Sequence, residues 1–131
     1  MEIADKDRFK AAFISRFGLF EWVVLPFGLC NAPSTFQHLM NTTLGDLLDR
    51  FVLVYLDDIL VYSADLEQHE LHLRTILQRL RQHTLYTKHS KSDFGVLKVE
   101  YLGHIVGGGK VWADPAKISA VTEWPARTTV K

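Results

Sequence analysis

Two adjacent aspartates, Asp57 and Asp58, lie between two short apolar runs in the stretch FVLVYLDDILVY. Runs of valine, isoleucine, leucine and aromatic residues of this length are typical of β-strands. They predict a β-hairpin with strands at residues 51–56 and 59–62 and with the aspartates at or beside its turn. Two carboxylates about 4 Å apart repel by roughly 4 kcal/mol at an effective dielectric of about 20. The flanking apolar strands should also reduce the water that screens them.

A divalent cation bound to the two carboxylates would relieve this repulsion. Hard oxygen ligands suit Mg²⁺ or Mn²⁺, and Mg²⁺ often takes only one or two protein carboxylates beside substrate phosphates. The alternative is that the aspartates only make the turn polar, because Asp tolerates turn conformations. The residues of the hairpin alone leave both interpretations open.

Two amphipathic helices are expected to support the hairpin. Apolar residues at helical spacing predict a first helix at about 33–49 and a second at about 65–82, packed side by side under a sheet. Asn31 and Pro33 favour a helix start, and the N-terminal end of that helix favours an anion. Asp65 followed by Gln68 is typical of a capping box. The apolar stripes consist of Phe36, Leu39, Met40, Leu44, Leu47 and Leu48 in the first helix and of Leu66, Leu73, Ile76, Leu77 and Leu80 in the second.

Shorter elements are predicted on both sides of this centre. Residues 1–10 have few apolar positions and are expected to form an exposed lead-in. Composition predicts strands at 13–17 and 20–24, a strand at 99–106 with a glycine turn at 107–109 and a return at 110–113, and a short helix from Asp114-Pro115 through Glu123 that Pro125 ends.

The stretch His69-Glu70-Leu71-His72 combines residue types found in zinc-binding helices. Its histidines are three residues apart and therefore do not reproduce the H-E-x-x-H pattern. Solvated helix surface is the preferred interpretation of these residues.

Length and composition indicate one domain of an ordinary soluble globular protein. The chain has 131 residues, of which 47% are hydrophobic and 23% are charged. A single cysteine, Cys30, excludes an internal disulfide. No apolar run approaches the roughly 18 to 20 residues of a membrane helix, and the first residues lack the features of a signal peptide. We expect an intracellular protein, cytoplasmic or nuclear, that is not secreted and not bound to a membrane.

The formal net charge is zero, with 15 basic and 15 acidic residues. Nucleic-acid-binding domains usually carry a basic surface, so composition alone gives no support to that function. A positive channel would have to come from local patches or from segments outside this chain.

Three segments in the chain resemble reverse transcriptases, and they occur in the order found in that family. Tyr55-Leu56-Asp57-Asp58 resembles the catalytic hairpin, the stretch from Leu25 to Gln37 (LPFGLCNAPSTFQ) resembles the segment that positions template and nucleotide, and Tyr101-Leu102-Gly103-His104 follows downstream. The resemblance is to the polymerase of gypsy-class LTR retrotransposons and covers nearly all of the chain.

This resemblance implies an α+β fold, with a palm-like antiparallel sheet packed on two helices and truncated at both ends. Residues 1–131 would form a single partial reverse transcriptase domain, with a hairpin at the edge of the fingers and the start of the thumb or connection. The implied reaction is nucleotidyl transfer from a dNTP to a primer 3′-OH on an RNA or DNA template, with two Mg²⁺ or Mn²⁺ ions.

The resemblance also assigns roles to individual residues. Asp57 and Asp58 would be the catalytic metal ligands, and Lys91 would donate a proton to the departing pyrophosphate, with Lys88 as a competitor for that role. Gly103 could permit close approach of a backbone or be an ordinary strand glycine. The nucleotide and template would contact Pro26, Phe27, Gly28, Gln37 and Tyr55, and the primer grip would comprise Leu102, Gly103 and His104.

In the reverse transcriptase family, a third catalytic carboxylate precedes the segment that corresponds to residues 10–13 of this chain. Asp5 and Asp7 occur in a polar context and do not take its role. We therefore expect weak or absent metal binding and no polymerase activity from this chain alone. The alternative is a non-catalytic retroelement relic that binds nucleic acid or a protein, with self-association through exposed sheet edges.

Overall fold

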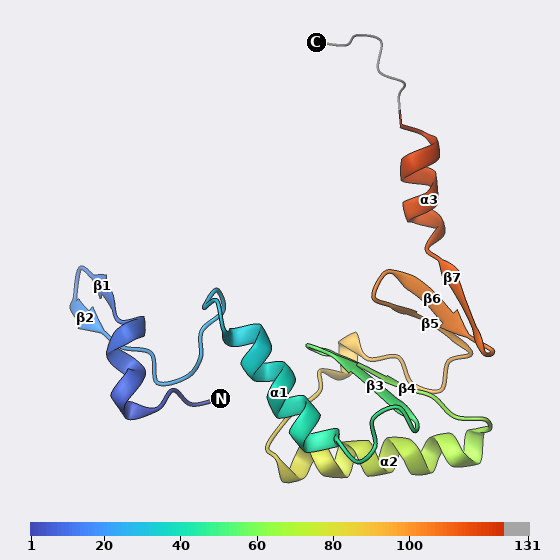
Figure 1. Cartoon of the computed structure of the whole chain (residues 1–131), viewed down its shortest axis with the longest axis horizontal. Coiled ribbons are helices and arrows are strands. Elements are labelled where there is room, and N and C mark those ends of the chain that lie inside the picture. Colours follow the sequence, from blue (N-terminus) through green and yellow to red (C-terminus); the bar gives the residue numbers. More distant parts are fainter. Residues whose placement is uncertain (125–131) are drawn as a thin grey trace.

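The structure is a computed structural model, and it describes residues 1–124. Antiparallel hairpins alternate with helices along the chain (Figure 1). Pro125, which was predicted to end the last helix, lies outside the described residues. In order, the elements are the 3-10 helix η1 (Asp5–Ala11), β1 (Phe13–Ser15), β2 (Gly18–Phe20), α1 (Ala32–Leu44), β3 (Val52–Tyr55), β4 (Asp58–Val61), α2 (Leu66–Gln82), the 3-10 helix η2 (His89–Lys91), β5 (Lys98–Tyr101), β6 (His104–Gly107), β7 (Lys110–Ala113) and α3 (Pro115–Thr122).

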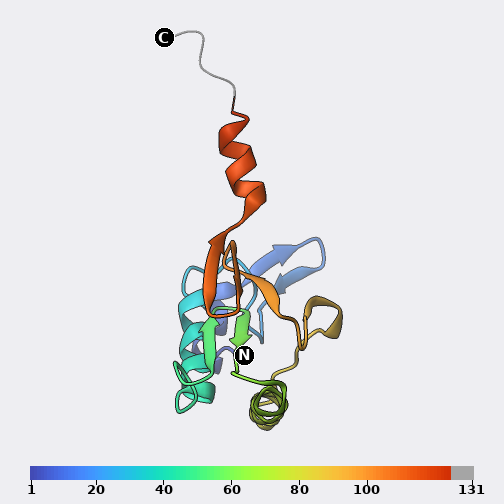
Figure 2. The same cartoon turned by 90° about the vertical axis from the view of Figure 1, so that its right-hand side faces the viewer.

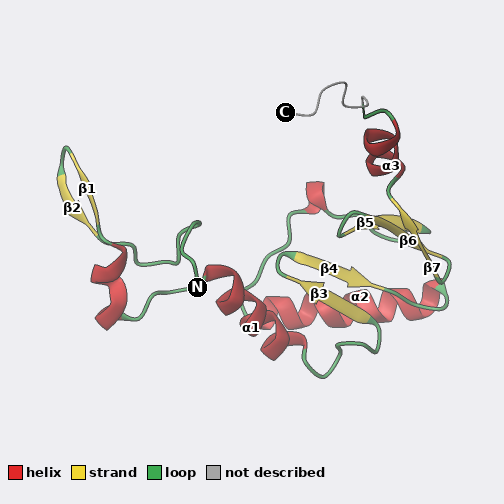
Figure 3. Cartoon of the chain, turned by 45° about the horizontal axis from the view of Figure 1, so that its top comes forward, coloured by secondary structure: helices red, strands yellow, loops and turns green. Residues whose placement is uncertain are grey.

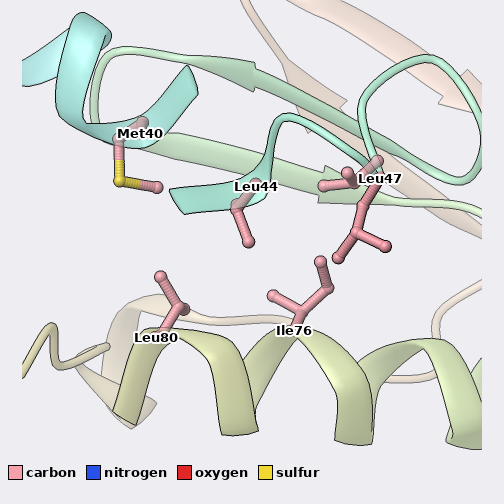
Figure 4. Packing of buried hydrophobic residues seen from close by; sticks show 6 residues of the cluster. Met40, Leu44, Leu47, Ile76 and Leu80 are labelled. Carbon is pink, nitrogen blue, oxygen red and sulfur yellow. The ribbon is translucent and has the colours of Figure 1, made fainter. Parts of the chain in front are cut away.

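The core lies between α1, α2 and the β3–β4 hairpin, which is drawn over α2 in Figure 3. Side chains of α1 and of the turn after it face Ile76 and Leu80 of α2 (Figure 4). Val52 of β3 and Leu44 of α1 are fully buried. The buried apolar residues are Met40, Leu44, Leu47, Val52, Ile76 and Leu80. The two predicted helices and the predicted central hairpin therefore exist and bury one shared face.

The predicted apolar stripes do not coincide fully with the buried faces of α1 and α2. Leu47 is buried but follows the end of α1, which stops at Leu44 rather than at 49. Gly45 follows that end, and glycine is a poor helix residue, so the chain turns there while Leu47 still reaches the core. Leu66 and Leu77 of α2 are exposed, because the hairpin and α1 cover only part of its apolar stripe.

Arg79 of α2 binds the C-terminal end of α1. Its guanidinium Nη1 donates to the Thr43 carbonyl at 3.0 Å, and Nη1 and Nη2 donate to the Asp46 carboxylate at 2.8 and 3.0 Å. The last carbonyls of a helix have no partner within the helix, so an arginine here satisfies one of them. Arg79 therefore links α2 to the C-terminal end of α1.

The strands form three separate small sheets rather than one. β1 pairs with β2, β3 with β4, and β5 with β6 and β7, all antiparallel. The α+β class and the antiparallel pairing are confirmed, and the predicted strand at 99–106 is a hairpin of β5 and β6. Figure 2 shows α3 projecting from the end of the three-stranded sheet.

Residues 1–10 are mostly exposed, as predicted, and they include most of the 3-10 helix η1. Arg8 pairs with Asp5 at 2.7 Å and Lys10 pairs with Asp7 at 2.6 Å. Residues three apart lie directly above one another in a 3-10 helix, so this charge spacing suits it. The strand predicted at 13–17 is shorter, and the one predicted at 20–24 begins two residues earlier and ends at Phe20. Val24 forms an isolated bridge with Glu2 instead of extending β2.

The helix starts follow the predicted capping signals. The Asp65 carboxylate accepts a hydrogen bond from the Gln68 N–H at 2.8 Å, and the Asp114 carboxylate accepts one from the Ala116 N–H at 2.9 Å. In residues 1–124, no helix has both the length and the hydropathy needed to cross a membrane.

The contact between Arg79 and Asp46 makes a prediction about acid stability. The hydrogen bond from Arg79 holds the pKa of the Asp46 carboxyl below its ordinary value of 3.8. A carboxyl whose pKa is lower in the folded state stabilises the fold above its unfolded pKa, and this stabilisation is lost as the pH falls through the folded value. We expect Asp46→Asn to lower the free energy of unfolding near neutral pH and to have little effect near pH 2.

The measurement is urea unfolding of wild type and variant across this pH range. Arg79→Gln serves as the matched variant because it removes the other partner, and it should give the same loss of pH dependence. A difference between wild type and Asp46→Asn that stays constant down to about pH 2 would contradict this account.

Candidate active site

A two-residue turn, Leu56-Asp57, joins β3 to β4. Tyr55 pairs with Asp58 at the end of the ladder, so Asp57 lies in the turn and Asp58 begins the return strand. Leu56 has φ 51°, a left-handed conformation that costs a non-glycine residue roughly 1 to 2 kcal/mol. The predicted hairpin is thus found with its ends shifted by one residue, and its turn is strained beside the two aspartates.

Gln37 of α1 holds the strained turn. Its Oε1 accepts a hydrogen bond from the Leu56 N–H at 2.6 Å, and its Nε2 donates to the Val54 carbonyl at 3.3 Å. The same Nε2 donates to Asn41 Oδ1 at 2.8 Å, which fixes the orientation of the amide. A single side chain therefore ties the first helix to the backbone that positions Asp57. The predicted contact of Gln37 with nucleotide or template stays a prediction.

Asp57 and Asp58 are both exposed. We had expected the flanking strands to shield them, but the turn projects beyond the packed part of the hairpin, so water screens their repulsion. Both line an open cleft of about 660 Å³ between β4, α2, the loop after α2 and β5. Their oxygens are of the type that Mg²⁺ or Mn²⁺ binds. Among the described residues there is no group of three or more His, Cys, Asp or Glu side chains able to hold a metal.

The cleft brings together groups from distant parts of the sequence. Lys91, at the end of η2, and Lys88 line it with the two aspartates. Tyr101 of β5 also lines it, and burial, together with the negative charge of Asp58, raises the pKa of the Tyr101 hydroxyl. This cleft therefore unites the predicted metal ligands, the predicted proton donor and the strand that leads into the predicted primer grip.

Sequence reasoning did not identify Tyr101 as a site residue. A possible signal was that each of the two Tyr-Leu pairs, at 55–56 and at 101–102, starts a tight turn. Leu56 and Leu102 both have φ 51°.

The turn between β5 and β6 contains Leu102 and Gly103, with His104 starting β6. A Cβ atom on Gly103 would overlap the Nζ of Lys117 in α3. Within this chain, a lysine side chain lies close to Gly103. The expected approach of a backbone to this glycine stays a prediction. Lys117 is a second residue that the sequence analysis missed, because the contact joins residues in different elements.

The predicted nucleotide segment from Pro26 to Gly28 lies in the loop between β2 and α1, outside the cleft. Phe27 is fully exposed, and Gly28 has φ 96°, which glycine adopts readily. Tyr55 is also exposed, and its side chain does not line the cleft. The structure thus leaves these residues accessible without bringing them together with the aspartates in one pocket.

The stretch interpreted as solvated helix surface is so at Glu70 and Leu71, which are exposed, but only in part at His69 and His72 of α2. Both are half-buried, and both lie within hydrogen-bonding distance of Ser63. Sequence spacing alone could not reveal Ser63, which lies outside the helix.

Residues 2–106 match the family model described as "Reverse transcriptase (RNA-dependent DNA polymerase)". The retrovirus-related Pol polyproteins from the Drosophila melanogaster transposons opus and gypsy are 38% and 35% identical to this chain, over 131 and 123 residues. These alignments cover 100% and 94% of this chain but only 13% and 12% of the two polyproteins.

Solved structures of reverse transcriptases have the same fold. The foamy viral protease-reverse transcriptase in complex with RNA/DNA hybrid matches with a TM-score of 0.83 and 19% identity, over 96% of this chain and 17% of that chain. The native prototype foamy virus enzyme matches with a TM-score of 0.73 and 28% identity, over 82% of this chain and 14% of that chain.

The chain therefore belongs to the reverse transcriptase family. Its transposon relatives place it with the reverse transcriptases of gypsy-class LTR retrotransposons, as the three sequence segments indicated.

The contacts of Gln37 make a second prediction. Gln37→Ala leaves the Leu56 N–H without its partner, and losing a hydrogen bond in a partly buried position costs about 1 to 2 kcal/mol. Because the lost contact is local, amide exchange at Leu56 should speed up by roughly five- to thirtyfold. Hydrogen exchange followed by NMR measures this rate.

The matched variant is Gln37→Glu, which keeps an acceptor for the Leu56 N–H but loses the amide donor. It should leave the exchange rate of Leu56 closer to wild type than Gln37→Ala does. Equal exchange in wild type and Gln37→Ala would show that the side chain does not hold the turn.

Proposed function

We propose that this chain provides the catalytic hairpin and the nucleotide- and primer-positioning segments of an RNA-directed DNA polymerase. The supporting observation is the cleft that joins Asp57 and Asp58 to Lys91 and Tyr101. Membership of the reverse transcriptase family supports assigning polymerase chemistry to this cleft. Structures of the similar foamy viral protease-reverse transcriptase were solved in complex with an RNA/DNA hybrid and with dsDNA. The partners of this chain would accordingly be an RNA or DNA template-primer and a dNTP.

In this proposal Asp57 is the direct ligand of a divalent cation, Mg²⁺ or Mn²⁺, and Asp58 is its neighbour with the secondary role. When bound, such ions activate the primer 3′-OH and neutralise the nucleotide phosphates. The protein groups would act around them. Lys91, an ammonium that also lines the cleft, would donate a proton to the departing pyrophosphate.

The positioning segments surround this centre. The residues proposed to contact nucleotide and template are Pro26, Phe27, Gly28, Gln37 and Tyr55, and those proposed to grip the primer are Leu102, Gly103 and His104. The exposure of Phe27 and Tyr55 leaves their faces free for stacking on a base. Gln37 would act on the site through the turn that it holds.

We further propose that the chain alone does not extend a primer. Two-metal transfer needs ligands shared between both ions, and Asp57 and Asp58 would supply only part of that set. Metal affinity should be correspondingly weak. The chain spans about an eighth of the transposon polyproteins that it matches, so the remaining ligands would come from other Pol segments.

A primer-extension assay tests the proposal in two settings. The purified chain, with Mg²⁺ or Mn²⁺, should give no extension above background. A chimaera in which this chain replaces the matching segment of the transposon gypsy polyprotein should extend a primer. In that chimaera Asp57→Asn should lower the rate at least about a hundredfold, because several kcal/mol of charge stabilisation are lost.

Asp49→Asn is the matched control, since Asp49 is an exposed acid at the other end of β3. Its φ is 60°, a conformation that asparagine tolerates. This variant should keep the activity of the chimaera. Extension by the isolated chain that depends on Asp57 would refute its inactivity, and an active Asp57→Asn chimaera would refute the proposed site.

A second candidate function is association with a second copy of the chain through the β1–β2 hairpin. Its side chains Ile14, Phe17 and Leu19 are 82%, 75% and 66% exposed. Both edges of this two-stranded sheet also lack a further paired strand among the described residues, and open edges promote pairing between chains.

Sedimentation velocity at increasing concentration tests this association. The wild-type chain should form dimers or larger species, and Ile14→Lys should shift it toward monomer because a charge replaces exposed apolar surface. Leu66→Lys is the control, since Leu66 is similarly exposed but lies on α2. A monomeric wild-type chain, or equal effects of the two variants, would exclude the hairpin as the interface.

A further inference from the structure

A cluster of polar side chains lies where β4 leads into α2, on the opposite end of the hairpin from Asp57. Ser63 follows β4, and its Oγ is 3.2 Å from His69 Nδ1 and 2.7 Å from His72 Nδ1. Phe51, just before β3, stacks on the His72 ring with centroids 3.8 Å apart and planes 5° apart. All four side chains are half-buried, so the two imidazoles are held in place by packing.

The number of hydrogen-bond donors and acceptors in this cluster indicates what it could bind. A serine hydroxyl has one hydrogen and can donate it to only one of the two Nδ1 atoms. The direction of the two contacts depends on the histidine tautomers. An imidazole protonated on Nδ1 donates to the Ser63 Oγ, whereas with both imidazoles protonated on Nε2 one Nδ1 has no donor and both Nδ1 lone pairs are open to a ligand. A cation between the two Nδ1 atoms, next to the Ser63 Oγ, would engage both lone pairs at once.

We propose that His69, His72 and Ser63 form a binding site for a transition-metal ion of the Zn²⁺ type. Neutral imidazole is a preferred ligand of such ions, and Zn–N distances are about 2.0–2.1 Å. Two nitrogens that both reach one oxygen atom come within bonding distance of an ion close to that oxygen after small rotations of the rings. Water completes the coordination. This donor set differs from the H-E-x-x-H pattern that the sequence excludes.

The local charges are compatible with a cation at this position. The N-terminal end of α2 has a positive dipole, which opposes a cation. Asp65 and Glu67 place two carboxylates on the same end of the helix, and they offset that field. Glu70 is paired with Arg74 at 3.1 Å, which balances its charge.

The site differs in its ligand chemistry from the one proposed at Asp57 and Asp58, and His69 lines the same cleft as these aspartates. Carboxylates suit Mg²⁺, whereas imidazole nitrogens bind Zn²⁺ and neighbouring transition metals more readily. A bound ion would connect the end of β4 to the first turns of α2. It would therefore stabilise the junction that anchors the hairpin, without taking part in nucleotidyl transfer.

Titration of the full chain with ZnCl₂ in a calorimeter, and with CoCl₂ followed by visible absorption, tests this proposal. We expect one ion per chain, a rise in thermal unfolding temperature with Zn²⁺, and no competition from a large excess of Mg²⁺. His69→Gln and His72→Gln should each weaken binding by at least about tenfold, because each removes one of two nitrogen ligands.

His83→Gln is the matched control, since His83 is an exposed histidine at the other end of α2. It should bind Zn²⁺ as tightly as wild type. Ser63→Ala should weaken binding less than either ligand variant, because a neutral hydroxyl is the weakest of the three ligands. These measurements of Zn²⁺ affinity do not depend on whether the chain has polymerase activity.

An NMR titration of the wild-type chain tests the proposal even if the variants fail to fold. Zn²⁺ should shift the ring signals of His69 and His72 before those of the other four histidines. Absence of Zn²⁺ binding, equal binding by His69→Gln, His72→Gln and His83→Gln, or simultaneous shifts of all histidines would each overturn the proposal.

Discussion

Burial of one apolar face shared by α1, α2 and β3 is the constraint on which the arrangement of the site depends. Leu44 and Val52 are fully buried and Ile76 and Leu80 nearly so, whereas the β1–β2 hairpin exposes its large apolar residues. The core fixes α1 against the β3–β4 hairpin, and this places Gln37 beside the Leu56 N–H. The position of the two aspartates thus follows from packing some distance away from them.

The packing of α1 against the hairpin supports the strained turn at Leu56. A left-handed leucine is unfavourable by itself, and the hydrogen bond from its N–H to Gln37 offsets part of that cost. The residue after it, Asp57, projects into water at the mouth of the cleft. Backbone strain at a functional turn is sustained where the surrounding structure holds it in place, and here that support comes from a single amide on a neighbouring helix.

Most of the elements could be predicted from sequence because their signals are local. The valine-rich runs around Asp57, the helical spacing of apolar residues and the caps at Asp65 and Asp114 each act within a few residues. The family was recognisable because three short segments keep their order. Contacts between distant residues could not be predicted, since Gln37 and Leu56, Arg79 and Asp46, or Lys117 and Gly103 are joined only by the fold. For the same reason, the strands were predicted but not their division into three sheets.

That division into three sheets affects how the chain opens. No hydrogen-bond ladder crosses from one sheet to another in residues 1–124, so the β1–β2 hairpin and the β5–β7 sheet can each open without breaking the pairs of β3 and β4. Cooperative unfolding is then confined to the segment from α1 to α2, where the core lies. The hairpin with the two aspartates, together with Gln37 and Tyr55, belongs to the most persistent unit of the chain. The loop at residues 26–28 and the turn at residues 102–103, which are proposed to contact nucleotide and primer, lie outside that unit and exchange with open forms more readily.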